Sequence, residues 1–130
     1  MRVLLDTQAI LWYLEGDAHL SDPARTTIDE TINDCLVSVA SLWEMAVKVR
    51  IGKLTSASGS PPTATILGDL ARTHIALLPI ASAHALRVAL LPRGHGDPFD
   101  LLIIAQALEE GTPVVSSDTK FDEFGVTRIW

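Results

Sequence analysis

Four acidic residues lie where an apolar run ends or a helix begins, and carboxylates that meet at one place can hold metal ions. Asp6 follows the run RVLL, and Asp118 follows PVVSS. Glu44 comes after CLVSV, in the first turn of the helix predicted next, and Asp100 opens the helix before the last of these runs. Together the four charges would repel one another, so one or more should be protonated or bound to cations. Carboxylate and water oxygens suit Mg²⁺ or Mn²⁺, with substrate phosphate completing the shell.

Each acid also has a purely structural explanation. Asp6 can cap a helix that begins at Thr7. Glu44 can pair with Lys48 one helical turn later, which is worth about 0.3–0.5 kcal/mol. Asp118 lies in SSDTK, an ordinary turn composition. These explanations are reasonable one at a time, but all must hold together at the edge of the sheet where a ligand is expected.

The stretch HGDPFDLLIIAQAL contains two aspartates with different predicted roles. Asp97 precedes a proline, which is favoured at the first helical position, so Asp97 is predicted to be the N-cap. Asp100 lies three residues later, where a capping-box role is the alternative. Its helical neighbours Ile103, Ile104 and Ala107 should face the core. A carboxylate beside that face needs a cation or strong donors, which favours a site role for Asp100.

Apolar runs alternate with helical patterns along the chain, which predicts the elements that position these acids. The fold class is α/β, with a central parallel sheet of four to five strands covered by helices on both faces. Ligands bind such sheets outside the carboxyl ends of the strands, where the acids fall. Strands are predicted at 2–5, 35–39, 75–80, 113–117 and 125–130, and helices at 7–14, 21–32, 40–54, 64–74, 81–91 and 97–110.

Length and composition predict one folded domain over residues 1–130. The chain is 48% hydrophobic and 20% charged, which supplies a core and argues against disorder. No apolar run approaches the ~18 residues that span a membrane. Asp6 interrupts the apolar start, so no signal peptide is predicted. The single cysteine, Cys35, excludes an internal disulfide and favours the cytoplasm.

The charge balance restricts how the chain could meet nucleic acid. The net charge is −6, whereas proteins that grip nucleic acid by bulk electrostatics are usually basic. Any nucleic-acid role must therefore rest on a local site or on bound cations. The histidines His19, His74, His84 and His95 are scattered and do not have the spacing of a zinc site.

Four segments, taken in order, resemble the PIN-domain ribonucleases, and most closely the VapC-type toxins of bacterial toxin–antitoxin pairs. They are LLDTQAILWYL, VSVASLWEMAVKVRIGKL, HGDPFDLLIIAQAL and VVSSDTKFDEFGV, and the resemblance runs nearly end to end. It implies a small three-layer α/β/α domain that cleaves RNA with Mg²⁺ or Mn²⁺. It also implies a homodimer and a cognate antitoxin that inhibits the nuclease.

Carried over by position, the resemblance assigns the catalytic, metal-binding acids to Asp6, Glu44 and Asp100, with a more variable fourth at Asp118. The family often has histidine two residues after the first aspartate, and here it is Gln8. It often has arginine after the third, and here it is Leu101. These departures leave the metal ligands in place and concern how RNA is held.

Candidates for contact with RNA are basic or polar residues near these acids. The alternative for the basic group at 48–53 is a solvated helix end that complements the helix dipole. Ser116 could help by hydrogen bonding near Asp118, and the alternative, which we favour, is an ordinary strand-end serine. The candidates are Lys48, Arg50, Lys53, Arg93, His95 and Ser116.

Two other functions are compatible with the sequence. A receiver-like signalling domain would share the α/β pattern, although LLDTQ has one acid where receivers usually have adjacent acids. A catalytically weak relative could instead bind a protein, with Trp12, Tyr13 and Trp43 lining a groove for a partner helix. Core packing explains these three aromatic residues equally well.

Overall fold

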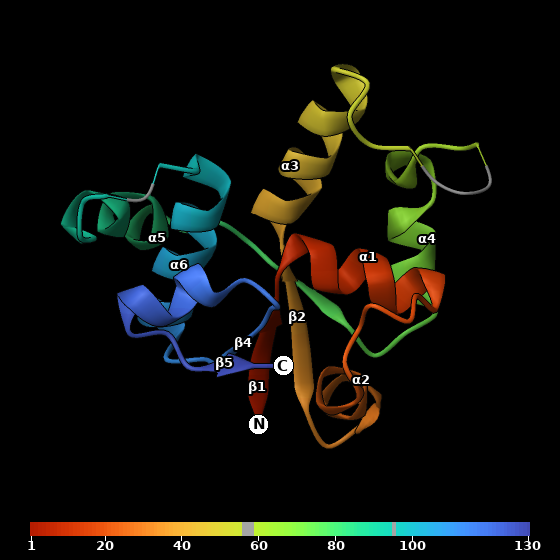
Figure 1. Cartoon of the computed structure of the whole chain (residues 1–130), viewed down its shortest axis with the longest axis horizontal. Helices are drawn as coiled ribbons and strands as arrows, with labels where there is room; N and C mark the ends of the chain where they lie inside the picture. Colours follow the sequence, from red (N-terminus) through yellow and green to blue (C-terminus); the bar gives the residue numbers. More distant parts are fainter. Residues whose placement is uncertain (56–58, 95) are drawn as a thin grey trace.

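The computed structural model describes residues 1–55, 59–94 and 96–130 of the chain (Figure 1). Its centre is a sheet in which all the paired strands run parallel, in the order β3-β2-β1-β4-β5. The five-stranded parallel sheet confirms the predicted fold class. The strands are β1 (Arg2–Leu5), β2 (Asp34–Ser38), β3 (Ala76–Leu78), β4 (Val114–Val115) and β5 (Arg128–Ile129).

Helices cover both faces of this sheet, so the predicted three-layer α/β/α architecture is confirmed. Figure 1 shows α1, α2 and α4 on one side and α5 and α6 on the other, while α3 continues beyond the end of β2. The helices are α1 (Thr7–Glu15), α2 (Asp22–Asp29), α3 (Val39–Arg50), α4 (Ile66–Ala71), α5 (Ser82–Arg87) and α6 (Pro98–Glu110).

Neighbouring residues of one strand enter two different hydrophobic cores. Val3 and Leu5 of β1 pack with residues of α1, α2 and α4, whereas Leu4 packs with residues of α6. Successive side chains of a strand point to opposite faces. A strand covered on both faces must therefore be apolar at every position, as the run Val3–Leu5 is.

Several predicted elements are shorter in the structure. β3 ends at Leu78 because Pro79 follows and has no N–H to donate to the sheet. The helix predicted at 64–74 is a 3₁₀ turn, Pro62–Ala64, followed by α4, and the one predicted at 81–91 gives way to a 3₁₀ turn after Arg87. The 3₁₀ segment Thr119–Phe124 (η3) was not predicted. Such short turns are too brief to produce a periodic pattern.

Both ends of α6 agree with the sequence. Asp97 is the N-cap, and its Oδ1 accepts hydrogen bonds from the backbone N–H groups of Phe99 at 2.9 Å and Asp100 at 3.3 Å. Gly111 ends the helix with φ of 62°, a left-handed conformation that favours glycine. Among the described residues, no helix is long and apolar enough to cross a membrane.

The cap at Asp97 leads to a stability prediction. Asp97→Ala should lower the free energy of unfolding by about 1 kcal/mol, because two backbone N–H groups lose their acceptor. For a domain of this size that is about 3–5 °C in Tm. Asp97→Asn keeps an acceptor oxygen and removes only the charge, so it should unfold close to wild type. Thermal unfolding followed by circular dichroism makes the comparison, and equal losses in both variants would contradict a capping role.

Candidate functional site

The site lies where the order of the strands changes direction. From β1 the chain moves to β2 and β3 on one side, and β4 then enters on the other side of β1. In parallel sheets such a switch opens a crevice at the carboxyl ends of the strands. Asp6 directly follows β1, and its backbone N–H donates to the carbonyl of Val115 at 3.1 Å. The ends of β1 and β4 are thereby held side by side. A receiver-like sheet has the order 2-1-3-4-5, which this chain does not share.

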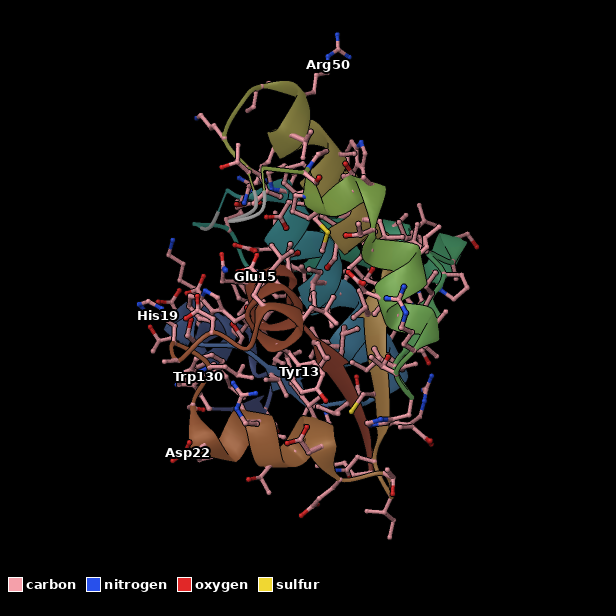
Figure 2. All side chains as sticks on the ribbon, turned by 90° about the vertical axis from the view of Figure 1, so that its right-hand side faces the viewer. Tyr13, Glu15, His19, Asp22, Arg50 and Trp130 are labelled. Carbon is pink, nitrogen blue, oxygen red and sulfur yellow. The ribbon has the colours of Figure 1, made fainter. Side chains whose placement is uncertain are left out.

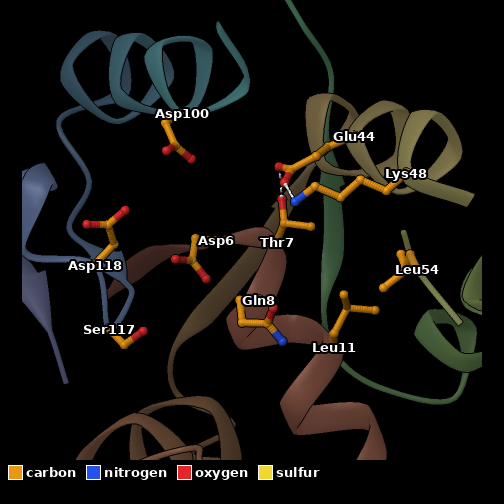
Figure 3. A pocket seen from close by; sticks show the side chains of 10 residues that line it. All are labelled: Asp6, Thr7, Gln8, Leu11, Glu44, Lys48, Leu54, Asp100, Ser117 and Asp118. Carbon is orange, nitrogen blue, oxygen red and sulfur yellow. Dashed lines mark hydrogen bonds and ion pairs between the residues drawn. The ribbon is translucent and has the colours of Figure 1, made fainter. Parts of the chain in front are cut away.

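A pocket of about 380 Å³ occupies this edge. Figure 3 shows the predicted acids around it, with Asp100 pointing from α6 toward Asp6 and Asp118, and Glu44 on α3 facing them. The fold thus brings together all four acids, from four separate segments of the chain. The pocket is lined by Asp6, Thr7, Gln8, Leu11, Glu44, Lys48, Leu54, Asp100, Ser117 and Asp118.

Asp6 both caps a helix and lines the pocket. It is 9% exposed, and its Oδ1 accepts from the backbone N–H of Ala9 at 2.7 Å. Its Oδ2 accepts a short hydrogen bond from the hydroxyl of Ser116. The same hydroxyl oxygen accepts from the backbone N–H of Asp118 at 3.0 Å. The structural explanation for Asp6 therefore does not compete with a site role, since one carboxylate fulfils both.

Glu44 is buried and held from two directions. It lies in the second turn of α3, one turn later than predicted, because α3 begins at Val39. Thr7 Oγ1 lies 2.8 Å from Glu44 Oε1 and 2.9 Å from Ser41 Oγ. A carboxylate has no hydrogen to give, so Thr7 donates to Glu44 and accepts from Ser41. Lys48 Nζ contacts Glu44 Oε2 at 2.6 Å, which is the predicted i,i+4 pair (Figure 3).

A buried glutamine ties α3 to α6. Gln106 is fully buried in the middle of α6, and its Oε1 accepts a short hydrogen bond from the hydroxyl of Ser38. Ser38 in turn caps α3, accepting from the backbone N–H of Ala40 at 2.9 Å. Gln106 Nε2 donates to the carbonyl of Pro79 at 3.3 Å. These bonds join the beginning of α3, which carries Glu44, to α6, which carries the third acid.

The crowding of acids alters the chemistry of Asp6. The pKa of its carboxyl is raised from 3.8 to about 6, chiefly by burial; hydrogen bonds from Ser116 and Ala9 act to lower it, and the negative charges of Glu44 and Asp118 act to raise it. A buried carboxylate next to like charges is thus costly to ionise. A bound cation would relieve that cost.

The donors in the pocket fit a hard divalent cation. Within the described parts of the chain, no three His, Cys, Asp or Glu side chains lie close enough to form a ready-made metal centre. Mg²⁺ does not need one, because it usually keeps several waters and is bound by one or two carboxylates together with substrate phosphate. The pocket offers carboxylate oxygens from Asp6, Glu44, Asp100 and Asp118, and each carboxylate oxygen can accept more than one bond.

The predicted RNA contacts are spread more widely than the acids. Lys48 lines the pocket. Arg50 and Lys53 are exposed at and beyond the end of α3, and Figure 2 shows Arg50 extending away from the molecule. Arg93 is exposed in the loop before α6, and His95 lies outside the described residues. Ser116 is fully buried, so it positions the acids from beneath and does not face a substrate.

Residues with small polar side chains were missed by reasoning from the sequence. Thr7 and Ser41 orient Glu44, and Ser117 lines the pocket. Their only sequence clue was position, because Thr7 and Ser117 adjoin predicted acids and Ser41 lies one turn before Glu44. A hydroxyl side chain in such a place is too common to stand out.

The three aromatic residues considered as a groove for a partner helix have separate neighbours. Trp12 packs against the core and Trp130, and the hydroxyl of Tyr13 donates to Asp29 at 2.8 Å. Trp43 is 56% exposed and contacts Phe99 edge-to-face, with 5.0 Å between ring centroids. None of the three lines the acidic pocket.

The raised pKa of Asp6 predicts an unusual pH dependence of stability. An acid whose pKa rises on folding stabilises the folded state below its unfolded pKa of 3.8, and this contribution is lost as pH rises through about 6. Asp6→Asn removes the buried charge and keeps a side chain that can cap. Without divalent metal, it should therefore raise the free energy of unfolding at neutral pH by about 1–3 kcal/mol.

Urea unfolding in EDTA, near pH 4 and near pH 8, measures this effect across the pKa range of Asp6. The gain from Asp6→Asn should be present at the higher pH and shrink toward zero at the lower. Asp34→Asn makes the same chemical change at an exposed position at the opposite end of the sheet and serves as the control. A gain that does not change with pH would show that burial of charge is not its cause.

Comparison with solved structures places the fold among known proteins. The chain is 16% identical to a chain of VapBC2 from Rickettsia felis bound to a DNA fragment from their promoter, with a TM-score of 0.70 over 98% of this chain and 97% of that one. For DNA-bound VapBC from Salmonella typhimurium the identity is 16% and the TM-score 0.67, over 98% and 96%. For FitAcB from Neisseria gonorrhoeae the identity is 17% and the TM-score 0.67, over 97% of this chain and 95% of that one. At these identities the likeness establishes a shared fold.

Sequence comparison gives the family directly. No curated protein matches the chain. The sequence model of the PIN domain matches residues 3–126, which spans nearly the whole chain and includes all four pocket acids. The resemblance seen in the sequence is therefore confirmed at the level of the family: this chain belongs to the PIN domain family.

Proposed function

We propose that this chain is a ribonuclease that hydrolyses RNA phosphodiester bonds with Mg²⁺ or Mn²⁺, formed by one PIN domain over residues 1–130. The observation that carries the proposal is the convergence of Asp6, Glu44, Asp100 and Asp118 on one pocket at the switch point of the sheet. Cation binding there would also explain how a chain of net charge −6 approaches a polyanion.

In this proposal the four acids hold the metal, and buried polar groups hold the acids. Bound Mg²⁺ or Mn²⁺ would supply a water of lowered pKa and stabilise charge on the phosphate oxygens. Ser116 holds Asp6 through a hydrogen bond to Oδ2. Thr7 holds Glu44 through Oε1. Fixed carboxylates need little rearrangement when the charged substrate arrives, which is the advantage of a preorganised site.

Lys48 provides the positive charge nearest to the acids. Its ammonium group pairs with Glu44 at 2.6 Å, yet its side chain is 44% exposed while that of Glu44 is 8% exposed. The lysine therefore reaches solvent while it is paired with the buried carboxylate. We infer that Lys48 contacts an RNA phosphate when substrate occupies the pocket, and that Arg50, Lys53, Arg93 and His95 extend this contact along the strand.

We further propose that the nuclease is the toxin of a toxin–antitoxin pair, acting in the cytoplasm as a homodimer. The support is that the similar solved structures include VapBC and FitAcB complexes, and a structure described as a toxin–antitoxin complex from Klebsiella pneumoniae, with a TM-score of 0.60. A cognate antitoxin would then hold the activity in check.

Metal-dependent cleavage is tested with a small panel of variants. Asp6→Asn and Asp100→Asn should each lower the rate of RNA cleavage in Mg²⁺ or Mn²⁺ by at least about 100-fold. Even the outer partners of metal ligands cost about 10–100-fold when removed, and a ligand should cost more. EDTA should abolish cleavage, and added Mn²⁺ should restore it in wild type only.

The same panel includes its controls. Asp34→Asn, far from the pocket, should cleave like wild type, and a DNA strand of the same sequence tests whether RNA is the preferred substrate. Cleavage is measured on denaturing gels with end-labelled strands. Equal rates for wild type and Asp6→Asn would show that the activity belongs to a contaminant or that the pocket is not its site.

The toxin proposal has a separate test. The reading frame directly upstream of this gene should encode a small protein that binds the chain. Expressed alone, wild type should arrest growth of a bacterial host, and co-expression of the upstream protein should restore it. Asp100→Asn should be harmless in either case. If wild type, expressed alone in the same amount as Asp100→Asn, does not slow growth, the toxin role is wrong, whatever the cleavage assay shows.

A further inference from the structure

Three aromatic rings, two from the N-terminal part of the chain and one from its last residue, meet in one cluster. The ring of Trp12 stacks on that of His19, with centroids 5.3 Å apart and planes 20° apart. On another side Trp12 contacts Trp130, with centroids 5.8 Å apart and planes inclined by 47°. Figure 2 shows His19 and Trp130 together at one margin of the molecule.

The cluster adjoins the acidic pocket through the backbone on both sides. Trp12 follows Leu11 and lies one helical turn after Gln8, and both of these residues line the pocket. Trp130 follows Ile129, whose carbonyl accepts a hydrogen bond from the backbone N–H of Ser116 at 3.2 Å. The cluster is therefore joined through the backbone to the pocket-lining segments that contain Gln8 and Leu11 in α1 and Ser117 after β4.

His19 is held in place although it is exposed. Its side chain is 75% exposed, so burial does not account for its position. Asp17 Oδ1 accepts from the backbone N–H of His19 at 2.8 Å and lies 2.7 Å from its ring Nδ1. The left-handed Gly16, with φ of 65°, makes the turn that leads into this loop. Two hydrogen bonds thus keep an exposed ring flat against Trp12, which leaves its other face open to solvent.

The chemistry of this surface suits a nucleobase better than a phosphate. Aromatic rings bind bases by stacking, which is worth about 1–3 kcal/mol per base and works for any base. The carboxylate of Asp17 beside the ring disfavours a phosphate, since like charges repel. Arg25 contacts the same loop, donating from Nη2 to the carbonyl of Asp17 at 3.3 Å, and offers one positive charge next to the stack.

We propose that the Trp12–His19 stack is a base-binding subsite, which takes a base of a nucleotide flanking the scissile phosphate on the side of Gln8 and Ser117. This inference rests on the proposed ribonuclease function. It gives the nuclease a means of holding RNA that does not depend on positive charge, which suits a chain of net charge −6.

Binding is tested first, by a measurement that does not require cleavage. An RNA oligonucleotide is titrated into the full chain in Ca²⁺ buffer, and intrinsic tryptophan fluorescence is followed. Wild type should be quenched on binding, because a base stacks near Trp12. His19→Ala should bind about 5- to 20-fold more weakly, in the lower part of the range for loss of one base stack. His19→Phe keeps a ring and the backbone hydrogen bond to Asp17, so it should bind more tightly than His19→Ala.

His74→Ala is the matched control, because His74 is also exposed but lies between α4 and β3, away from the cluster. It should bind like wild type. Equal affinities for wild type and His19→Ala would overturn the proposal, and so would a loss in His19→Phe as large as in His19→Ala. The second outcome would mean that the histidine acts through its charge or its hydrogen bond.

Cleavage kinetics then separate this subsite from the proposed reaction. In Mn²⁺, His19→Ala should raise KM for RNA about 5- to 20-fold and leave hydrolysis of bis(p-nitrophenyl) phosphate, which has no base, unchanged. The rise in KM should vanish for an RNA lacking the base at one flanking position, since a lost contact cannot be lost twice. The same rise on the intact and every abasic substrate would overturn the subsite. Absence of cleavage by wild type would instead contradict the proposed ribonuclease function. The fluorescence titration would still test whether the Trp12–His19 stack binds a base.

Discussion

The buried carboxylate of Asp6 is the constraint around which the rest of the site is arranged. It follows β1 at the centre of the sheet, and its backbone N–H holds the end of β4 through Val115. Its two oxygens accept from Ala9 and Ser116. Moving this side chain would disturb a helix start, a strand end and the loop to Asp118 together. The position of the charge is therefore fixed by the fold and not by the pocket alone.

Ionising the buried carboxyl of Asp6 is energetically unfavourable. Burial and neighbouring acids raise the pKa of Asp6 to about 6. Proteins retain destabilising ionisable groups of this kind at functional sites. There the group lowers the stability of the free protein but is already positioned to bind a ligand. Elsewhere the chain follows the ordinary rules of stability. The run Val3–Leu5 of β1 is apolar on both faces, and Gln106 satisfies its buried amide through Ser38 and Pro79.

The surroundings of the pocket suggest how an acidic chain could bind RNA. Lys48 is already paired with Glu44, and Arg50 extends away from the molecule, so cationic contact near the acids is limited. Aromatic stacking by Trp12 and His19 would add affinity without charge. In this proposal the bound metal, Lys48 and the stacked rings together provide the RNA contacts that a basic groove provides in other nucleases.

The sequence alone determined the fold class, the cap at Asp97 and which acids would meet, because strand and helix patterns are local and parallel strands end at one edge. It could not determine that Thr7 holds Glu44, that Ser116 lies buried under Asp6, or that Trp12 meets His19 and Trp130. It also did not predict the short 3₁₀ segment η3, and it predicted a longer strand than the two-residue β5. Hydrogen bonds and ring contacts between distant segments depend on how helices pack on the sheet, and only the tertiary structure decides that geometry.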